Sequence, residues 1–203
     1  MITATEMEAI VAKQLEQVTE WHKSDYEAPL DDEFESAATW LHHFNYELWH
    51  QEDLARDPDA ADPDIAQVKR NIDKLNQKRN DMIETLDSHL VAMLADVKST
   101  LSPDTKLNSE TPGSMVDRLF INALKIYHMQ EEVDREDAEE EHRAKCRGKV
   151  AVLHEQRTDL SNCLIEALDD LKHGRRRLKV YQQMKMYNDP SLNPVLYGNK
   201  EAK

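Results

Sequence analysis

Cysteine, glycine and proline are all scarce in this chain of 203 residues, which has 2 Cys, 4 Gly and 7 Pro. So few turn-forming residues exclude the dense turns of an all-β protein and favour long helices. Hydrophobic residues make up 39% of the chain and charged residues 33%, against roughly 25% charged residues in an average globular domain. The composition therefore predicts a single all-α domain, 1–203, with one sizeable core.

The two cysteines, Cys146 and Cys163, fall in the same predicted helix, where their spacing separates them by roughly 25 Å. That separation excludes an intrachain disulfide, because bridged cysteines need neighbouring Cα atoms. Neither cysteine belongs to a CxxC pair, so the sequence supports neither a thiolate zinc site nor a redox motif.

Positive charge is also in short supply, since the formal net charge is -14 at pH 7. This balance repels nucleic-acid phosphates and anionic membrane surfaces, so we expect no nucleic-acid partner. No apolar run approaches the roughly 18 residues of a spanning helix, and MITATEMEAIVAK lacks the basic and apolar regions of a signal peptide. We therefore expect a cytoplasmic protein without a membrane span.

Start and stop signals along the chain predict five long helices, with caps at Thr3, Asp62, Thr111 and Asp137. The predicted helices cover 3–23, 32–56, 62–100, 111–132 and 137–174. A short sixth helix is expected over 175–187. Residues 188–203 are expected to form an irregular C-terminal tail, because Pro190 and Pro194 interrupt helical hydrogen bonding.

Two of the long helices each place one arginine in an apolar seam, Arg79 in LNQKRND and Arg157 in LHEQRTD. Superposing these arginines also superposes His50 on His128, which indicates that the second and third helices repeat as the fourth and fifth. Helices rich in Leu, Glu and Asp match one another easily, so chance similarity is the equal alternative. Either way, the seams predict an antiparallel bundle with four long core helices, which a duplicated hairpin would explain, plus terminal helices.

A guanidinium in such a seam requires a carboxylate, because an unpaired buried charge costs several kcal/mol. We therefore predict a contact from Arg79 to Glu52 or Asp117, within an internal polar cluster centred on Glu52, Arg79, Asp117 and Lys125. The alternative is that Arg79 packs its stem at the edge of the seam and keeps its head in water.

The second helix also carries residues at metal-ligand spacings. Glu47 and His50 have the E-x-x-H spacing of helical di-iron proteins, but the repeat pairs Glu47 with Lys125, which cannot act as a ligand. His43, Glu47 and His50 could instead hold one divalent ion. We favour the interpretation that these histidines are structural, one exposed and another hydrogen bonded in the core.

Basic residues gather in two places in this acidic chain. Arg118, Asn122 and Lys125 share one face of the fourth helix, where they could hold an anion or simply form surface ion pairs. The stretch GRRRLKVYQQMK could bind a phosphate-bearing small molecule, although pairing with the excess of Asp and Glu is the simpler explanation.

Four stretches, NYELWHQEDLAR, VKRNIDKLNQKRNDMIE, ETPGSMVDRLFINALKIYHM and KVYQQMKMYNDPSLNPVLYG, together resemble the bacterial domain-of-unknown-function family 4254. The resemblance covers nearly the whole chain and implies a single helical domain, but it carries no activity. It draws attention to the polar residues inside these stretches as candidates for ligand binding: Asn45, Trp49, His50, Glu52, Asp53, Asn76, Arg79, Asn80, Asp117, Arg118, Lys125 and His128.

Two functional classes follow from these patterns. We favour a binding or assembly module that self-associates, as a homodimer, through the bundle. The alternative is a magnesium-dependent enzyme similar to MazG-like nucleotide pyrophosphohydrolases, acting on a phosphate-bearing small molecule. Its metal ligands would be Glu47, Glu52, Asp53, Glu84 and Asp87, although His50 stands where a second acid is expected. No catalytic residue is assigned, and no cofactor is expected other than magnesium under the alternative.

Overall fold

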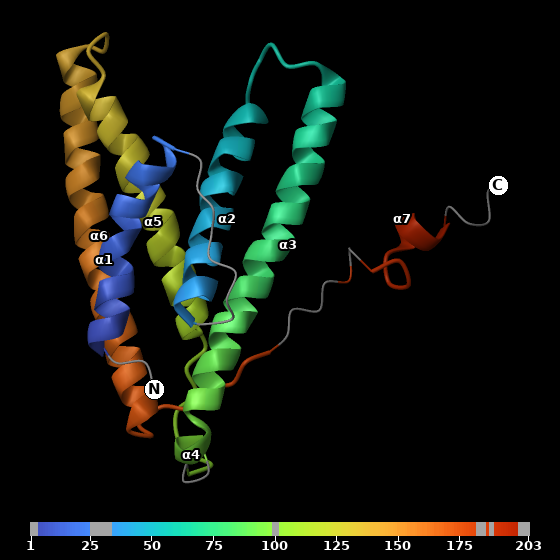
Figure 1. Cartoon of the computed structure of the whole chain (residues 1–203), viewed down its shortest axis with the longest axis vertical. Helices are drawn as coiled ribbons and strands as arrows, with labels where there is room; N and C mark the ends of the chain where they lie inside the picture. The colour runs from blue at the N-terminus through green and yellow to red at the C-terminus, as the bar shows by residue number, and fades with distance from the viewer. Residues whose placement is uncertain (1–3, 25–33, 99–101, 182–185, 187–188, 199–203) are drawn as a thin grey trace.

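Two antiparallel helical hairpins form the body of the molecule (Figure 1). The computed structural model describes residues 4–24, 34–98, 102–181, 186 and 189–198. The first hairpin pairs α2 (Phe34–Leu54) with α3 (Asp62–Met93), and the second pairs α5 (Pro112–Asp134) with α6 (Glu140–Lys172). The described part of the chain has only helices and one isolated β-bridge, so the expected all-α bundle is confirmed.

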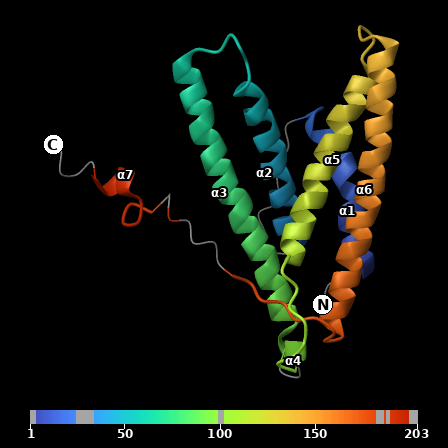
Figure 2. The ribbon, with the colours of Figure 1, turned by 180° about the vertical axis from the view of Figure 1, so that it is seen from behind.

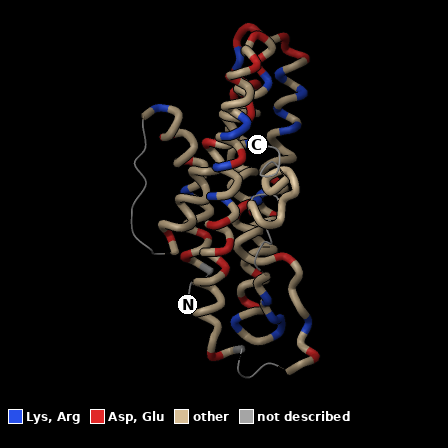
Figure 3. Tube along the Cα trace, turned by 90° about the vertical axis from the view of Figure 1, so that its right-hand side faces the viewer, with Lys and Arg blue, Asp and Glu red and all other residues tan. Residues whose placement is uncertain are grey.

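The remaining long helix, α1 (Ala4–Trp21), packs against α5, α6 and α2. Two short helices complete the set, α4 (Ala95–Lys98) below α3 and α7 (Pro194–Tyr197) near the C-terminus. Both hairpins turn at the same end of the molecule, and Asp and Glu gather there (Figure 3). The two hairpins correspond to the predicted repeat units, while common ancestry of the units stays a prediction.

The main core lies where both hairpins meet α1. Its fully buried side chains include Leu41 of α2, Leu86 of α3, Phe120 of α5 and Leu164 of α6. Each such side chain contributes about 1.5–3 kcal/mol through the hydrophobic effect. Both apolar seams of the sequence thus contribute to this core, through Leu86 of α3 and Leu164 of α6, and α1 packs against the second hairpin.

The amino-terminal end of α5 is built as its sequence predicts. Thr111 is the N-cap, its hydroxyl accepts a hydrogen bond from the Ser114 N–H, and Pro112 occupies the first turn. The Gly113 N–H donates to Asp87 Oδ1 at 2.8 Å, which joins α5 to α3. A Cβ atom at Gly113 would lie 2.8 Å from both Asp87 Oδ1 and the Ile83 carbonyl oxygen, so this close approach requires glycine.

Several predicted helix ends are wrong. α3 stops at Met93, before a break at Leu94, instead of continuing without interruption through the residues of α4. Ala61 is the N-cap of α3, and Asp62 already lies inside the helix. Glu139, not Asp137, caps α6, without a side-chain hydrogen bond. Neither Ala61 nor Glu139 makes a side-chain capping bond, so residue type did not mark the two actual caps. The predicted cap Thr3 lies outside the described residues.

The segment after α6 differs most from its prediction. Residues 175–181 are not helical; Gly174 turns the chain with φ 68°, and Arg177 forms a parallel bridge with Leu107. Hydrogen bonds from Arg175 and Arg176 to Asp170 hold the chain back against the end of α6, which competes with a new helix.

The tail that was expected to be irregular contains α7. Pro194 stands in its first turn and the Asn193 side chain accepts from the Val195 N–H, which is a favourable helix start. Figure 2 shows α7 apart from the bundle. None of the helices in the described part of the chain is long and apolar enough to cross a membrane.

Candidate functional site

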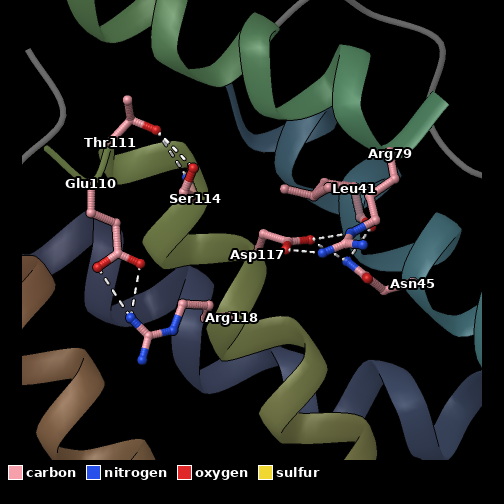
Figure 4. Close-up of polar contacts among 8 residues, drawn as sticks. All are labelled: Leu41, Asn45, Arg79, Glu110, Thr111, Ser114, Asp117 and Arg118. Carbon is pink, nitrogen blue, oxygen red and sulfur yellow. Dashed lines mark hydrogen bonds and ion pairs between the residues drawn. The ribbon is translucent and has the colours of Figure 1, made fainter. Parts of the chain in front are cut away.

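An ion pair joins the two hairpins (Figure 4). Arg79 of α3 donates from Nε to Asp117 Oδ1 of α5 at 2.8 Å, and its Nη2 donates to Oδ2. Asn45 of α2 donates from Nδ2 to the same Oδ1 at 2.8 Å and to the Leu41 carbonyl oxygen at 3.1 Å. The predicted contact of Arg79 with Asp117 is confirmed, and three helices meet at one carboxylate.

Burial and hydrogen bonding make this pair strong. The side chain of Asp117 is 6% exposed and that of Arg79 is 25% exposed. Because Asp117 hydrogen bonds to the guanidinium, the pKa of Arg79 is raised despite the opposing effect of burial. A two-point contact of this kind fixes the orientation of both groups.

A cleft of about 370 Å³ opens beside the ion pair. Side chains from α2, α3 and α5 line it, with Leu48, Ile121 and Leu124 as its apolar part. Half of the residues singled out in the sequence lie in its wall: Asn45, Trp49, Glu52, Asp53, Asn76 and Arg79. The structure thus brings these six together around one space, which is large enough for a small molecule.

Glu52 does not contact Arg79, in contrast to the other predicted option. It accepts a hydrogen bond from Arg56 Nη1 at 2.8 Å, one turn along the same helix. This pair is exposed to solvent, at 68% for Arg56 and 46% for Glu52. The internal cluster therefore consists of Arg79, Asp117 and Asn45, and Glu52 belongs to the mouth of the cleft.

Lys125 was predicted at the centre of the cluster, and the structure corrects this placement. Lys125 is exposed and lines a second space of about 660 Å³, a groove between α5 and α6. Leu124 points into the core, and the next residue along a helix lies on a different face, so Lys125 points away from the core. Arg118 is likewise on the surface, where it bonds Glu110 at 2.8 Å (Figure 4). Asn80 is half-buried in α3 and does not line the cleft.

The groove between α5 and α6 was missed by the sequence reasoning. Apolar and basic residues line it: Trp49, Lys125, His128, Met129, Lys145, Gly148, Lys149, Val152 and Leu153. Trp49 lines both spaces. One signal was Val152, an apolar residue of α6 that the structure leaves exposed.

The five acids proposed as magnesium ligands are not brought together. Asp87 is buried and accepts from the Gly113 N–H, whereas Glu52 and Asp53 lie at the cleft. His43 lies near Glu47, with 3.9 Å from Nε2 to Oε1. His50 does not join that pair; it meets His22 and His128, the only triad of potential metal ligands among the residues that the structure describes.

Arg157, the repeat counterpart of Arg79, has a different environment. It donates to the Leu119 carbonyl oxygen at 3.0 Å, to Gln14 Oε1 at 2.8 Å and to the Val11 carbonyl oxygen. Burial lowers its pKa to about 10. Its partners come mainly from α1, so this arginine ties α1 to the second hairpin and lies outside the cleft.

A known protein family covers nearly all of both hairpins, including the cleft and the groove. The family described as Protein of unknown function (DUF4254) matches residues 35–180. The chain belongs to this family. No curated protein and no solved structure matches the chain. Membership of DUF4254 confirms the resemblance seen in the sequence. The family carries no known activity, so a function has to be argued from the arrangement of the side chains.

Proposed function

We propose that this DUF4254 protein is a binding module whose cleft takes a small, uncharged molecule rich in hydroxyl groups. The observation that carries the proposal is the internal pairing of charges in the cleft wall. Asp117 neutralises Arg79, and Arg56 neutralises Glu52. Little net positive charge remains for a phosphate, since Lys125 lies in the other groove.

Hydrogen-bonding groups of both kinds remain in the wall after these pairs are formed. The Asn76 amide offers donors and an acceptor, Asn45 keeps its carbonyl oxygen, and Asp53 is a further acceptor. The Trp49 indole adds an apolar wall beside them. A hydroxyl group both donates and accepts, so a sugar or polyol matches this mixture better than a purely anionic ligand does.

Magnesium-dependent hydrolysis of a phosphate-bearing molecule needs acids gathered around the ion. Here Asp87 accepts a hydrogen bond from the Gly113 N–H at the start of α5, and Glu47 lies near His43. The arrangement therefore gives the enzyme alternative no added support. Self-association remains a prediction from the sequence, and sedimentation velocity on the purified chain tests it.

The test is calorimetric titration with glucose, mannitol and myo-inositol, and separately with inorganic phosphate and with ADP plus Mg²⁺. Asn76→Ala removes a cleft group, whereas Asn80→Ala removes the same group one turn away from the cleft wall. Because sugars stabilise any folded protein by exclusion from its surface, binding heat rather than melting temperature is the readout.

We expect heat from at least one polyol with wild type and Asn80→Ala, and a weaker response with Asn76→Ala. Absence of a response to all three polyols would overturn the proposal. Release of phosphate from ADP in the presence of Mg²⁺, abolished by Glu52→Gln, would replace it with the enzyme alternative.

A further inference from the structure

Three histidines from different helical segments converge on one point. His22 directly follows the end of α1, His50 lies in α2 and His128 in α5. One ring nitrogen from each lies within 4.8 Å of the other two. The ring centroids are 5.1 Å apart for His22 and His50, 5.2 Å for His22 and His128, and 5.7 Å for His50 and His128.

Two of these rings have their tautomer set by a hydrogen bond on the far side. His22 Nδ1 lies 2.7 Å from the Val18 carbonyl oxygen, which can only accept, so Nδ1 carries the proton. His128 Nδ1 lies 2.8 Å from Glu131 Oε2, which accepts in the same way. In a neutral imidazole, Nε2 then keeps its lone pair. A carbonyl or carboxylate on the outer nitrogen is the usual second contact of a metal-bound histidine.

The inner nitrogens have no partner. Nε2 of His22, of His50 and of His128 is buried in each case and makes no hydrogen bond with any residue that the structure describes. A buried polar atom without a partner is costly and therefore rare in folded proteins. Other buried side-chain polar atoms of the described residues also lack a partner, but these three come from three helical segments and meet at one point, which a shared ligand explains.

Aromatic neighbours hold the rings in place. Tyr127 stacks on His22 with centroids 4.2 Å apart, and Trp49 stacks on His128 at 4.7 Å. Tyr46 contacts His50 edge to face at 4.5 Å, and its hydroxyl is already used in a bond to the Trp21 carbonyl oxygen at 3.0 Å.

We propose that His22, His50 and His128 form a binding site for one divalent transition-metal ion of the zinc type. Imidazole nitrogen suits Zn²⁺, Co²⁺, Ni²⁺ and Cu²⁺, whereas Mg²⁺ and Ca²⁺ require oxygen ligands. Tetrahedral zinc with bonds of about 2.0–2.1 Å holds its nitrogens about 3.3 Å apart, so the rings move inward by about 1 Å when the ion binds. Three protein ligands leave the fourth position to water or to a bound molecule.

This site differs from the polyol cleft in its residues and its chemistry. Trp49 connects them, since it lines the cleft and stacks on His128. His50 and His128 lie within the range matched by the family, while His22 precedes it. Absence of polyol binding would therefore not argue against the metal site, and absence of metal binding would not argue against the polyol cleft.

The experiment is titration of the full chain, freed of any affinity tag and treated with a chelator, with Zn²⁺ and with Co²⁺. We expect one ion per chain, a rise in melting temperature with Zn²⁺ and the visible absorption of tetrahedrally coordinated Co²⁺. Mg²⁺ at the same concentration produces neither effect. The competing explanation is a water molecule between the three rings. Absence of Zn²⁺ binding by wild type would overturn the metal site and favour this explanation.

Variants locate the ion. His50→Ala abolishes the one-to-one binding, and the matched control His154→Ala, an exposed histidine of α6, keeps it. Glu131→Gln leaves all three ligands in place and weakens Zn²⁺ by about tenfold, because it perturbs only the outer contact of His128. Circular dichroism confirms folding of each variant. Unchanged affinity in both His50→Ala and Glu131→Gln would overturn the proposal.

Discussion

Trp49 and His128 stack face to face, with ring centroids 4.7 Å apart and an angle of 6° between their planes. This contact joins α2 of the first hairpin to α5 of the second. Trp49 lines both the cleft and the groove, and His128 lines the groove and belongs to the histidine triad. We therefore expect substitution of the Trp49 indole to affect the cleft, the groove and the histidine triad.

Trp49→Ala should lower the free energy of unfolding by about 2 kcal/mol, less than for a fully buried tryptophan because the side chain is half-buried. Urea denaturation measures the change. Polyol binding should weaken in the same variant. Trp40→Ala, at the other end of α2, provides the control for loss of an indole away from the cleft, and equal loss of binding in both variants would argue against the cleft.

Arg79→Leu should destabilise the fold by about 3 kcal/mol, because it leaves the Asp117 carboxylate buried without its partner. Arg56→Leu removes an arginine from an exposed pair and should change stability by less than about 0.5 kcal/mol. Chemical denaturation of Arg79→Leu, Asp117→Leu and the double variant measures the coupling. If the two single changes simply add, the ion pair does not join the hairpins energetically.

The helices and the Arg79 contact follow from local rules, since apolar periodicity and the need of a seam arginine for a carboxylate are visible in the chain. The choice between Glu52 and Asp117 is not, because it depends on the rotation of α2 against α5. The partners of Arg157 could not be predicted at all. They are main-chain oxygens and Gln14 of α1, and a main-chain oxygen is present at every residue whatever its type.

The histidine triad illustrates the same limit. The spacing of His43, Glu47 and His50 suggests one site within a helix, yet the structure joins His50 to residues of two other segments. Short-range spacing therefore identified one ligand candidate and the wrong companions. Residues 175–181 show the opposite case, in which ion pairs to Asp170 override a basic sequence that resembles a helix.

Acid should destabilise the protein through His42. Burial lowers its pKa from 6.5 to about 3, and its Nε2 contacts the Gln14 carbonyl oxygen at 3.0 Å. Since the folded state disfavours the charged ring, the stabilising contribution is complete above pH 6.5 and is lost as the pH falls towards 3. The whole shift corresponds to about 5 kcal/mol.

Urea denaturation at several pH values between about 4 and 8 measures this slope. His42→Phe keeps the ring that stacks on Phe120 and removes the titrating group, so its slope should be smaller than that of wild type. The exposed His154→Gln should leave the slope unchanged. Equal slopes for His42→Phe and wild type would assign the acid sensitivity to other groups, among which His43 and His50 also have lowered pKa values.

Adding one methyl group at two glycines should have opposite effects. Gly113→Ala places a Cβ 2.8 Å from Asp87 Oδ1 and from the Ile83 carbonyl oxygen, so α5 must shift from α3 and stability should fall by about 2 kcal/mol. Gly148 lies inside α6, where an added methyl carbon would meet nothing within 4 Å, and Gly148→Ala should raise stability by about 0.5–1 kcal/mol. Thermal and urea unfolding of the two variants provide the measurement. Because both add the same atoms to a helix, stabilisation by Gly113→Ala would mean that the contact between α3 and the start of α5 is looser than 2.8 Å.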